Sequence, residues 1–117
     1  MTIKEIADRL VALNRENNHE QAYKELYSED VLSIENWGGE RSEHKGMDAI
    51  KKKGEGWYAS VAEMHETTCS EPLVADNSFA VTFFMDITYK EGGRQKMTEL
   101  AVYTVKDGKI VEEEFKG

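Results

Sequence analysis

The sequence lacks the features that mark disulfide-stabilised, secreted and membrane-spanning proteins. Cys69 is the only cysteine, so no internal disulfide can form and the fold must be held by packing. No apolar run approaches the roughly 20 residues that a membrane-spanning helix needs. The opening Met-Thr-Ile-Lys-Glu has neither the basic nor the apolar region of a signal peptide. We therefore expect a soluble, cytoplasmic protein.

Basic side chains are also few, with 15 Lys and Arg against 23 Asp and Glu and a net charge of −8. Nucleic acids and anionic membranes bind clustered Lys and Arg, and the single basic run, Lys51 to Lys53, is typical of a solvated helix face. We expect neither partner. Metal-ligating side chains do not cluster at short spacing, and no glycine-rich phosphate loop joins a strand to a helix. The sequence thus predicts no metal and no cofactor.

The first half of the chain carries the helical signals of a single domain, residues 1–117. Thr2 and Glu5 have the spacing of a capping box, which predicts a helix start. Apolar residues then recur every three or four positions, at Ile3, Ile6, Leu10 and Leu13. Asn18 with Gln21 repeats the cap spacing for a short second helix, and a third helix is predicted over about 46–61.

Strand signals dominate the remainder of the chain. A short strand is predicted over 31–36, with Leu32 and Ile34 on its inner face. Beyond Glu63, four strands are separated by the turn sequences Asp76-Asn77, Gly92-Gly93 and Asp107-Gly108. Sequential antiparallel pairing is the expected outcome. The sequence therefore predicts an α+β fold, with three N-terminal-side helices over one face of a curved antiparallel sheet.

Alternation in the two longest strands identifies the face of the sheet that meets the helices. That face carries Phe79, Val81, Phe83, Met85, Ile87 and Tyr89 in one strand, and Met97, Glu99, Ala101, Tyr103 and Val105 in the next. Glu99 is the lone carboxylate among them. It is either a desolvated acid in a pocket, with a raised pKa and general acid/base capacity, or a group that stays wet or pairs with a lysine such as Lys53.

Three segments resemble the nuclear transport factor 2-like superfamily, in particular its SnoaL-like and ketosteroid-isomerase-like branch: ALNRENNHEQAYKELYSEDVLSIEN, HKGMDAI and AVYTVKDGKIVEEEF. They occur in the expected order and span nearly the whole chain. The resemblance implies a cone-shaped, cystatin-like fold, in which a strongly bent sheet wraps the long helix around an apolar pocket, usually in homodimers. It implies no single activity, because this scaffold hosts isomerases, cyclases, hydratases, epoxide hydrolases and non-enzymatic binders.

Ketosteroid isomerases use a carboxylate base at the end of the first strand, a Tyr on the first helix and a protonated Asp on the sheet. The resemblance places Asn36, Leu10 or its neighbour Arg9, and Ala101 at these three positions. Amide, alkyl and methyl side chains cannot abstract a proton or donate to an enolate. We therefore expect that the chain is not a steroid isomerase.

The polar residues near these positions are further candidates for the site. His65 opens a strand and could share a proton with Glu99 at a pocket rim, or be exposed or structurally bonded. Asn36 could orient a ligand carbonyl, or bond its own backbone. Glu35 should point away from Asn36 and outward, unless a bulge at the strand end reverses the two. Glu113 shares the alternation of its strand's core residues, although we expect an end position with solvent access.

Aromatic residues complete the predicted ligand-binding set. Trp57, Phe83 and Tyr103 either form the wall of a cavity or are plain core. We expect His19 and His44 to be solvated. Cys69 has no neighbouring helix terminus to lower the pKa of its thiol, so nucleophilic catalysis has little support.

Two functions remain open. In the first, a SnoaL-like domain binds a small apolar molecule in its pocket. In the second, a SnoaL-like enzyme of isomerase, cyclase or hydratase type uses Glu99 as general acid/base, with His65 or Asn36, on an apolar carbonyl substrate. A raised pKa of Glu99 in an open cavity favours the enzyme, and an ion pair in a closed core favours the binder. Separately, three apolar residues on the outer sheet face predict a homodimer formed through that face: Phe84, Leu100 and Val102.

Overall fold

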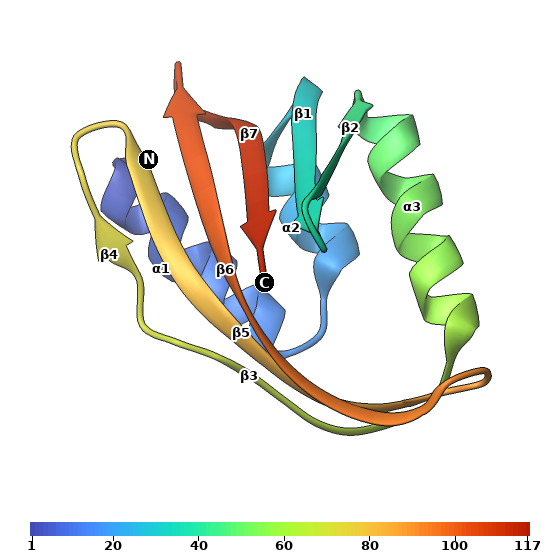
Figure 1. Cartoon of the computed structure of the whole chain (residues 1–117). Coiled ribbons are helices and arrows are strands. Elements are labelled where there is room, and N and C mark those ends of the chain that lie inside the picture. Colours follow the sequence, from blue (N-terminus) through green and yellow to red (C-terminus); the bar gives the residue numbers. More distant parts are fainter.

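The computed structural model describes residues 1–117 as three helices and a seven-stranded sheet (Figure 1). The helices are α1 (Ile3–Arg15), α2 (His19–Leu26) and α3 (Met47–Ser60). The strands are β1 (Tyr27–Trp37), β2 (Glu40–Lys45), β3 (Val61–Cys69), β4 (Leu73–Val74), β5 (Ser78–Tyr89), β6 (Gly93–Lys106) and β7 (Lys109–Lys116). The strands lie in the order β2-β1-β7-β6-β5-β3, and β4 adds to β5.

The predicted helix starts are confirmed by their caps. The Thr2 hydroxyl accepts from the Glu5 backbone N–H, and the Glu5 carboxylate accepts from the Thr2 N–H at 2.8 Å. The Asn18 side chain accepts from the backbone N–H of Gln21 at the start of α2. These side chains satisfy amides that the first helical turn leaves without partners. Both helices therefore begin where short-range sequence signals place them.

The four strands predicted beyond Glu63 are β3, β5, β6 and β7, and they pair antiparallel in that order. Positive φ angles at Gly92, Gly93, Asp107 and Gly108 close the last two hairpins. The prediction of a wholly antiparallel sheet is wrong at one ladder, because β1 lies parallel to β7. Strand alternation is the same for either direction of pairing, so the sequence pattern did not reveal this ladder or the unpredicted strand β2. The sheet is mixed.

The inner face of β1 is also the opposite of the one predicted. Val31 belongs to the hydrophobic core, Ser33 is fully buried, and Glu35 faces the pocket described below. Leu32 and Ile34 occupy the alternate positions, although Ile34 is buried on its own side. Apolarity alone suggested the wrong set, because Ser33 and Glu35 are inward side chains that find polar partners there.

The core fills one end of the concave side of the sheet, where α1 and α2 pack against it (Figure 1). It includes Ile6, Leu10, Leu13, Leu26, Phe79, Val81, Ala101, Tyr103 and Ile110. At the other end, α3 stands further from the centre, and the β5–β6 hairpin curves beneath its C-terminal end. Only Met47 and Ile50 of α3 are buried. The fold therefore leaves room between α3 and the core.

The outer sheet face shows the exposure that the dimer hypothesis requires at one of its three residues. Leu100 is 40% exposed, whereas Phe84 and Val102 are half-buried. The homodimer stays a prediction. None of the helices combines the length and apolar character needed to cross a membrane.

The attachment of α3 gives a first prediction. Ile50→Ala should lower the free energy of unfolding by about 3 kcal/mol, because it removes one of the two buried side chains that hold this helix. Urea denaturation measures the loss. The exposed Lys52 provides a control, since Lys52→Ala should change stability by less than about 0.5 kcal/mol. Equal stabilities for the two variants would contradict this account of α3.

Candidate functional site

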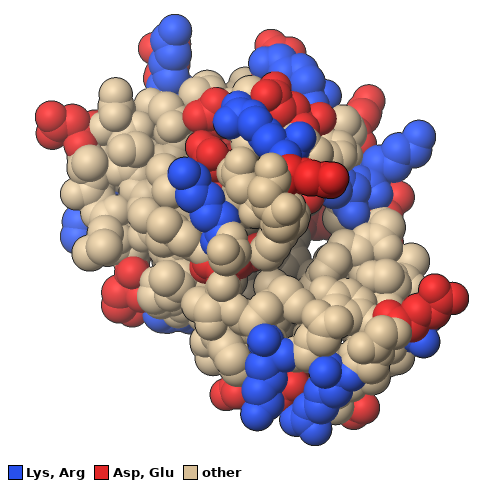
Figure 2. Space-filling view, viewed as in Figure 1, with Lys and Arg blue, Asp and Glu red and all other residues tan.

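A cavity of about 630 Å³ lies between α3, the first two helices and the curved sheet. Figure 2 shows a hollow on this face, walled by uncharged side chains with charged groups around it. Its aromatic lining comes from Tyr23, Tyr27, Trp37, Trp57, Tyr58, Phe83, Phe84, Tyr89, Tyr103 and Phe115. Small-molecule sites occupy roughly 300–1,000 Å³ and are mostly apolar with a few polar groups. The cavity has the size and character of such a site.

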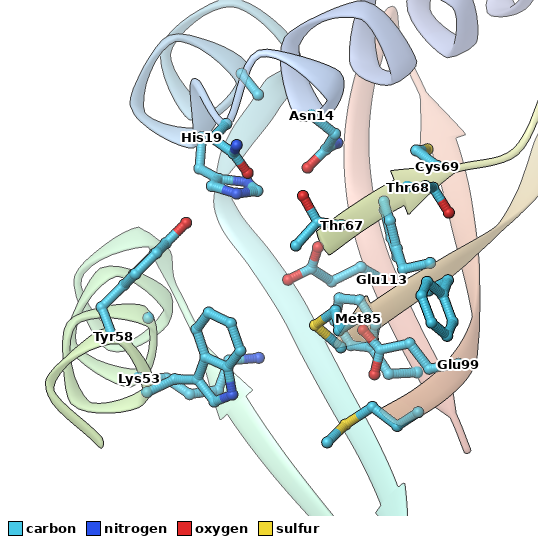
Figure 3. Close-up of a pocket in the computed structure, with 18 of the residues that line it drawn as sticks. Asn14, His19, Lys53, Tyr58, Thr67, Thr68, Cys69, Met85, Glu99 and Glu113 are labelled. Atoms are coloured by element: carbon cyan, nitrogen blue, oxygen red, sulfur yellow. The ribbon is translucent and has the colours of Figure 1, made fainter. Parts of the chain in front are cut away.

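Glu99 projects into this cavity from β6, next to Met85 (Figure 3). Its strand places it opposite Phe83 of β5, so its immediate surroundings are apolar. No hydrogen bond or ion pair to a protein group stabilises its charge. Burial is the main reason that the pKa of this carboxyl rises to about 7, and the nearby carboxylates Glu35 and Glu113 raise it further. The Lys53 ammonium acts in the opposite direction with a smaller effect.

Lys53, on α3, is bonded to groups other than Glu99. Its Nζ lies 3.1 Å from Oε1 of Glu35 and donates to Oγ of Ser33 at 2.7 Å. The ammonium also lies 5.2 Å from the ring centre of Phe115, within the range of a cation–π contact. These contacts hold the only cationic side chain of this part of the cavity against β1.

Glu113, on β7, is the third carboxyl of the group and is almost fully buried. Ser33 donates to its Oε1 at 3.0 Å, and the Tyr27 hydroxyl donates to its Oε2 at 2.6 Å. The parallel ladder places Ser33 directly beside Glu113. Burial raises the pKa of Glu113, although both donors and Lys53 oppose that rise. A continuous chain of contacts thus joins Lys53 through Ser33 to Glu113 and Tyr27.

Six of the eight residues predicted from the sequence line the cavity: Glu35, Trp57, Phe83, Glu99, Tyr103 and Glu113. Two of these six differ from the detail of the prediction. Glu35, expected to point outward, faces the cavity and pairs with Lys53. Glu113, expected to reach solvent, is buried because Ser33 and Tyr27 supply its hydrogen bonds. In both cases, polar partners on neighbouring elements hold the carboxylate in its observed position.

The other two predicted residues lie outside the cavity. Asn36 donates to Oε2 of Glu114 and to the backbone carbonyl of Phe115, so its amide serves the β1–β7 ladder. His65 Nε2 lies 2.7 Å from Oγ1 of Thr88, which occupies the imidazole in a contact across β3 and β5. The hypothesis of a proton shared between His65 and Glu99 is therefore wrong.

His19 and Cys69 are among the lining residues that were not predicted as parts of the site. His19, expected to be solvated, faces the cavity from the first position of α2. Cys69 also contributes to the wall, and burial raises the pKa of its thiol to about 11, so the thiol stays protonated at neutral pH. Because the residues around His19 are polar, the sequence gives no signal that this side chain at the start of a helix faces inward. No set of three or more His, Cys, Asp or Glu side chains is arranged to hold a metal ion.

Comparisons with known proteins give one family. The family model of the SnoaL-like domain matches residues 1–116. A Mesorhizobium loti protein, described provisionally as a SnoaL-like polyketide cyclase with carbohydrate phosphatase as a second description, is 34% identical, and each chain covers 100% of the other with a TM-score of 0.92. No match was found among curated proteins.

Two more distant structures share the fold. An NTF2-like protein of unknown function from Burkholderia pseudomallei K96243 is 16% identical with a TM-score of 0.78, over 99% of this chain and 91% of that one. TerC, crystallised with polyporic acid, is 18% identical with a TM-score of 0.73, over 97% of this chain and 87% of its own. The predicted resemblance and the nuclear transport factor 2-like fold are thereby confirmed.

The raised pKa of Glu99 predicts a pH-dependent effect on stability. The carboxyl has a pKa of about 7 when folded against 4.5 in the ordinary state, so the folded chain binds the proton more tightly. Ionised Glu99 therefore lowers the free energy of unfolding above pH 7, and this penalty disappears below pH 4.5. Glu99→Gln should be more stable than the native chain by about 2 kcal/mol at pH 8, with the gain lost through this window.

Urea denaturation of both chains at several pH values measures that difference. The exposed Glu66, on β3, provides the control, because Glu66→Gln should shift stability little and without this pH dependence. A gain for Glu99→Gln that is the same at pH 8 and pH 4.5 would contradict a desolvated Glu99.

Proposed function

Because this chain belongs to the SnoaL-like domain family, whose scaffold carries different activities, we propose a function from its own pocket: it binds an apolar, ring-containing carbonyl compound and Glu99 transfers a proton to or from it. The observation that supports this most directly is the state of Glu99, an unpaired carboxyl in an open, largely apolar cavity. General acid/base groups work best when their pKa lies near the working pH. With a pKa of about 7, Glu99 is available in both forms near neutrality.

The cavity lining favours the ring-containing part of this substrate. Trp57 on α3, Phe83 on β5 and Phe115 on β7 contribute flat apolar surfaces from different elements. Aromatic faces pack well on other rings, with a gain beyond the area that they bury. The pocket therefore suits rings better than open polar chains.

Lys53 supplies the electrostatic partner that proton abstraction next to a carbonyl requires. Removing such a proton places negative charge on the carbonyl oxygen, and a fixed cation nearby stabilises it. Two of the three N–H groups of Lys53 serve Glu35 and Ser33, which leaves one for a ligand oxygen. In the proposed reaction, the Glu99 carboxylate takes the carbon-bound proton and Lys53 holds the resulting enolate oxygen.

This arrangement differs from that of a steroid isomerase. The position where the resemblance predicts the catalytic base holds Asn36, which lies outside the cavity. Ala101 is buried and carries no donor, and Leu10 lines the wall as an alkyl group. The proposal therefore assigns proton transfer to β6 rather than to the end of β1.

The names of two similar proteins agree with the proposal. The Mesorhizobium loti relative is described provisionally as a polyketide cyclase, and TerC was crystallised with polyporic acid, so a chain of this fold has been studied with a small organic ligand. Binding without chemistry is the second candidate, favoured by the absence of all three steroid-isomerase groups. An exchange experiment separates the two candidates.

We expect the native chain to catalyse hydrogen–deuterium exchange next to the carbonyl of α-tetralone, a bicyclic aromatic ketone used as a probe. Proton NMR in D₂O should show exchange at least tenfold above buffer. The rate should rise with pH around a midpoint near 7, because only ionised Glu99 accepts the proton.

Glu99→Gln should abolish this exchange while leaving α-tetralone binding within about threefold, since the amide keeps the shape of the wall. Glu66→Gln, outside the cavity, should exchange at the native rate. Native exchange rates in Glu99→Gln would remove Glu99 from the reaction. Binding of α-tetralone without exchange in the native chain would favour the binding candidate.

A further inference from the structure

We propose that His19, Asn14 and Thr67 form a second, neutral polar subsite, which hydrogen-bonds a hydroxyl or carbonyl oxygen at the end of the ligand remote from Glu99. The inference deepens the proposed function and rests on it, because it takes the cavity to be a ligand site. It adds a requirement for the substrate, namely polar oxygens at both ends of an apolar ring system.

The three side chains converge from separate parts of the chain. Asn14 lies in the last turn of α1, His19 is the first residue of α2, and Thr67 lies in β3. Figure 3 shows their polar ends pointing toward one another across the cavity, whereas Glu99 lies apart from them, beyond Met85. All three line the same cavity as Glu99. The cavity thus has a second group of polar side chains, separate from Glu99.

The turn between α1 and α2 brings His19 to this position. Asn17 has a φ of 56°, a left-handed conformation that Asn tolerates better than most residues. Its neighbour Asn18 then caps α2, so only three residues separate the end of the first helix from the start of the second. Because the turn is short, the first side chain of α2 faces the same cavity as the last turn of α1.

The polar atoms of this group have spare hydrogen-bonding capacity. Asn14 donates one amide hydrogen to the Leu10 carbonyl at 2.9 Å, and its Oδ1 stays free. Neither the His19 ring nor the Thr67 hydroxyl takes part in any hydrogen bond of the structure. Only one buried side-chain nitrogen or oxygen lacks a hydrogen-bond partner, Nδ1 of His44, and it does not belong to this group. The free atoms of all three side chains are therefore open to the cavity, where a ligand can reach them.

The group is uncharged, which decides the kind of oxygen that it suits. Desolvation lowers the pKa of His19 below its usual 6.5, so the ring is neutral at pH 7. A neutral imidazole offers one donor and one acceptor, the Asn oxygen accepts, and the Thr hydroxyl does both. Arg15 also lines the cavity, but its guanidinium is bonded to the Cys69 carbonyl and shares its charge with Glu71, so a phosphate or carboxylate would find no free cation here. A hydroxyl or carbonyl matches the group without that cost.

Two fluorinated probes of the same ring size test the subsite directly. These are 6-fluoro-2-naphthol and 2-fluoronaphthalene, which differ in one hydroxyl, and ¹⁹F NMR measures the dissociation constant of each. The native chain should bind the naphthol about tenfold more tightly, as one hydrogen bond to a buried site predicts. The ring signals of His19 should move with the naphthol only, while those of His44 stay in place.

Substitution then assigns the preference to a residue. His19→Phe keeps a ring of similar size without hydrogen-bonding atoms, and should reduce the preference for the naphthol to less than about threefold. His19→Gln restores a donor and an acceptor and should recover much of it. His44→Phe makes the same chemical change outside the cavity and should retain the full preference.

Each contrary result has a distinct meaning. Equal binding of the two probes by the native chain would overturn the subsite and leave the pocket intact. A preference lost in Lys53→Met but kept in His19→Phe would place the hydroxyl at the Glu99 end, which overturns the subsite and agrees with the proposed function. If neither probe binds, both proposals fail together. The native His19 signals decide the matter even if a variant does not fold.

Discussion

Three carboxyl groups and a single lysine line the same largely apolar cavity, and this excess of acidic groups determines the chemistry of the pocket. Lys53 lies 3.1 Å from Glu35 and reaches Glu113 through the Ser33 hydroxyl. Its positive charge is therefore held on the β1 and β7 side of the cavity, where it stabilises the carboxylates of those strands. Glu99 carries its own charge among apolar neighbours, where desolvation favours the protonated form. Burial therefore raises the pKa of Glu99, and Lys53, which is paired with Glu35, offsets this rise only in part.

The topology of the sheet produces that arrangement. The parallel ladder between β1 and β7 sets Ser33 beside Glu113, which allows one serine to bridge a lysine and a buried carboxylate. The same lysine ties α3 to β1, while Met47 and Ile50 are the only fully buried residues of that helix. A loosely packed α3 leaves the cavity open, and a polar anchor keeps it in position. The way in which α3 is attached to the sheet thus explains two features: the cavity stays open, and Lys53 is held against β1.

Local signals in the sequence were sufficient for much of the fold. Caps at Thr2 and Asn18, turn sequences at the hairpins, and strict alternation in β5 and β6 predicted those elements and placed Glu99 on the inner face. Interactions between distant segments were not predictable in this way. The β1–β7 ladder joins residues about 80 positions apart, and alternation carries no information about its direction. Glu35 and Glu113 were misplaced for this reason, because their positions depend on partners that the local sequence does not identify. His19 was misplaced because its polar neighbours gave no signal of an inward-facing side chain.

The central claim is that Glu99 is an unpaired, desolvated acid in an open pocket, and its own titration tests that claim most directly. Carbon-13 NMR of the side-chain carboxyls, with Glu99→Gln used to assign the signal, gives its pKa in the native chain. The account predicts a value of about 7. A value near or below 4.5 would show a solvated or paired carboxylate and would contradict the account.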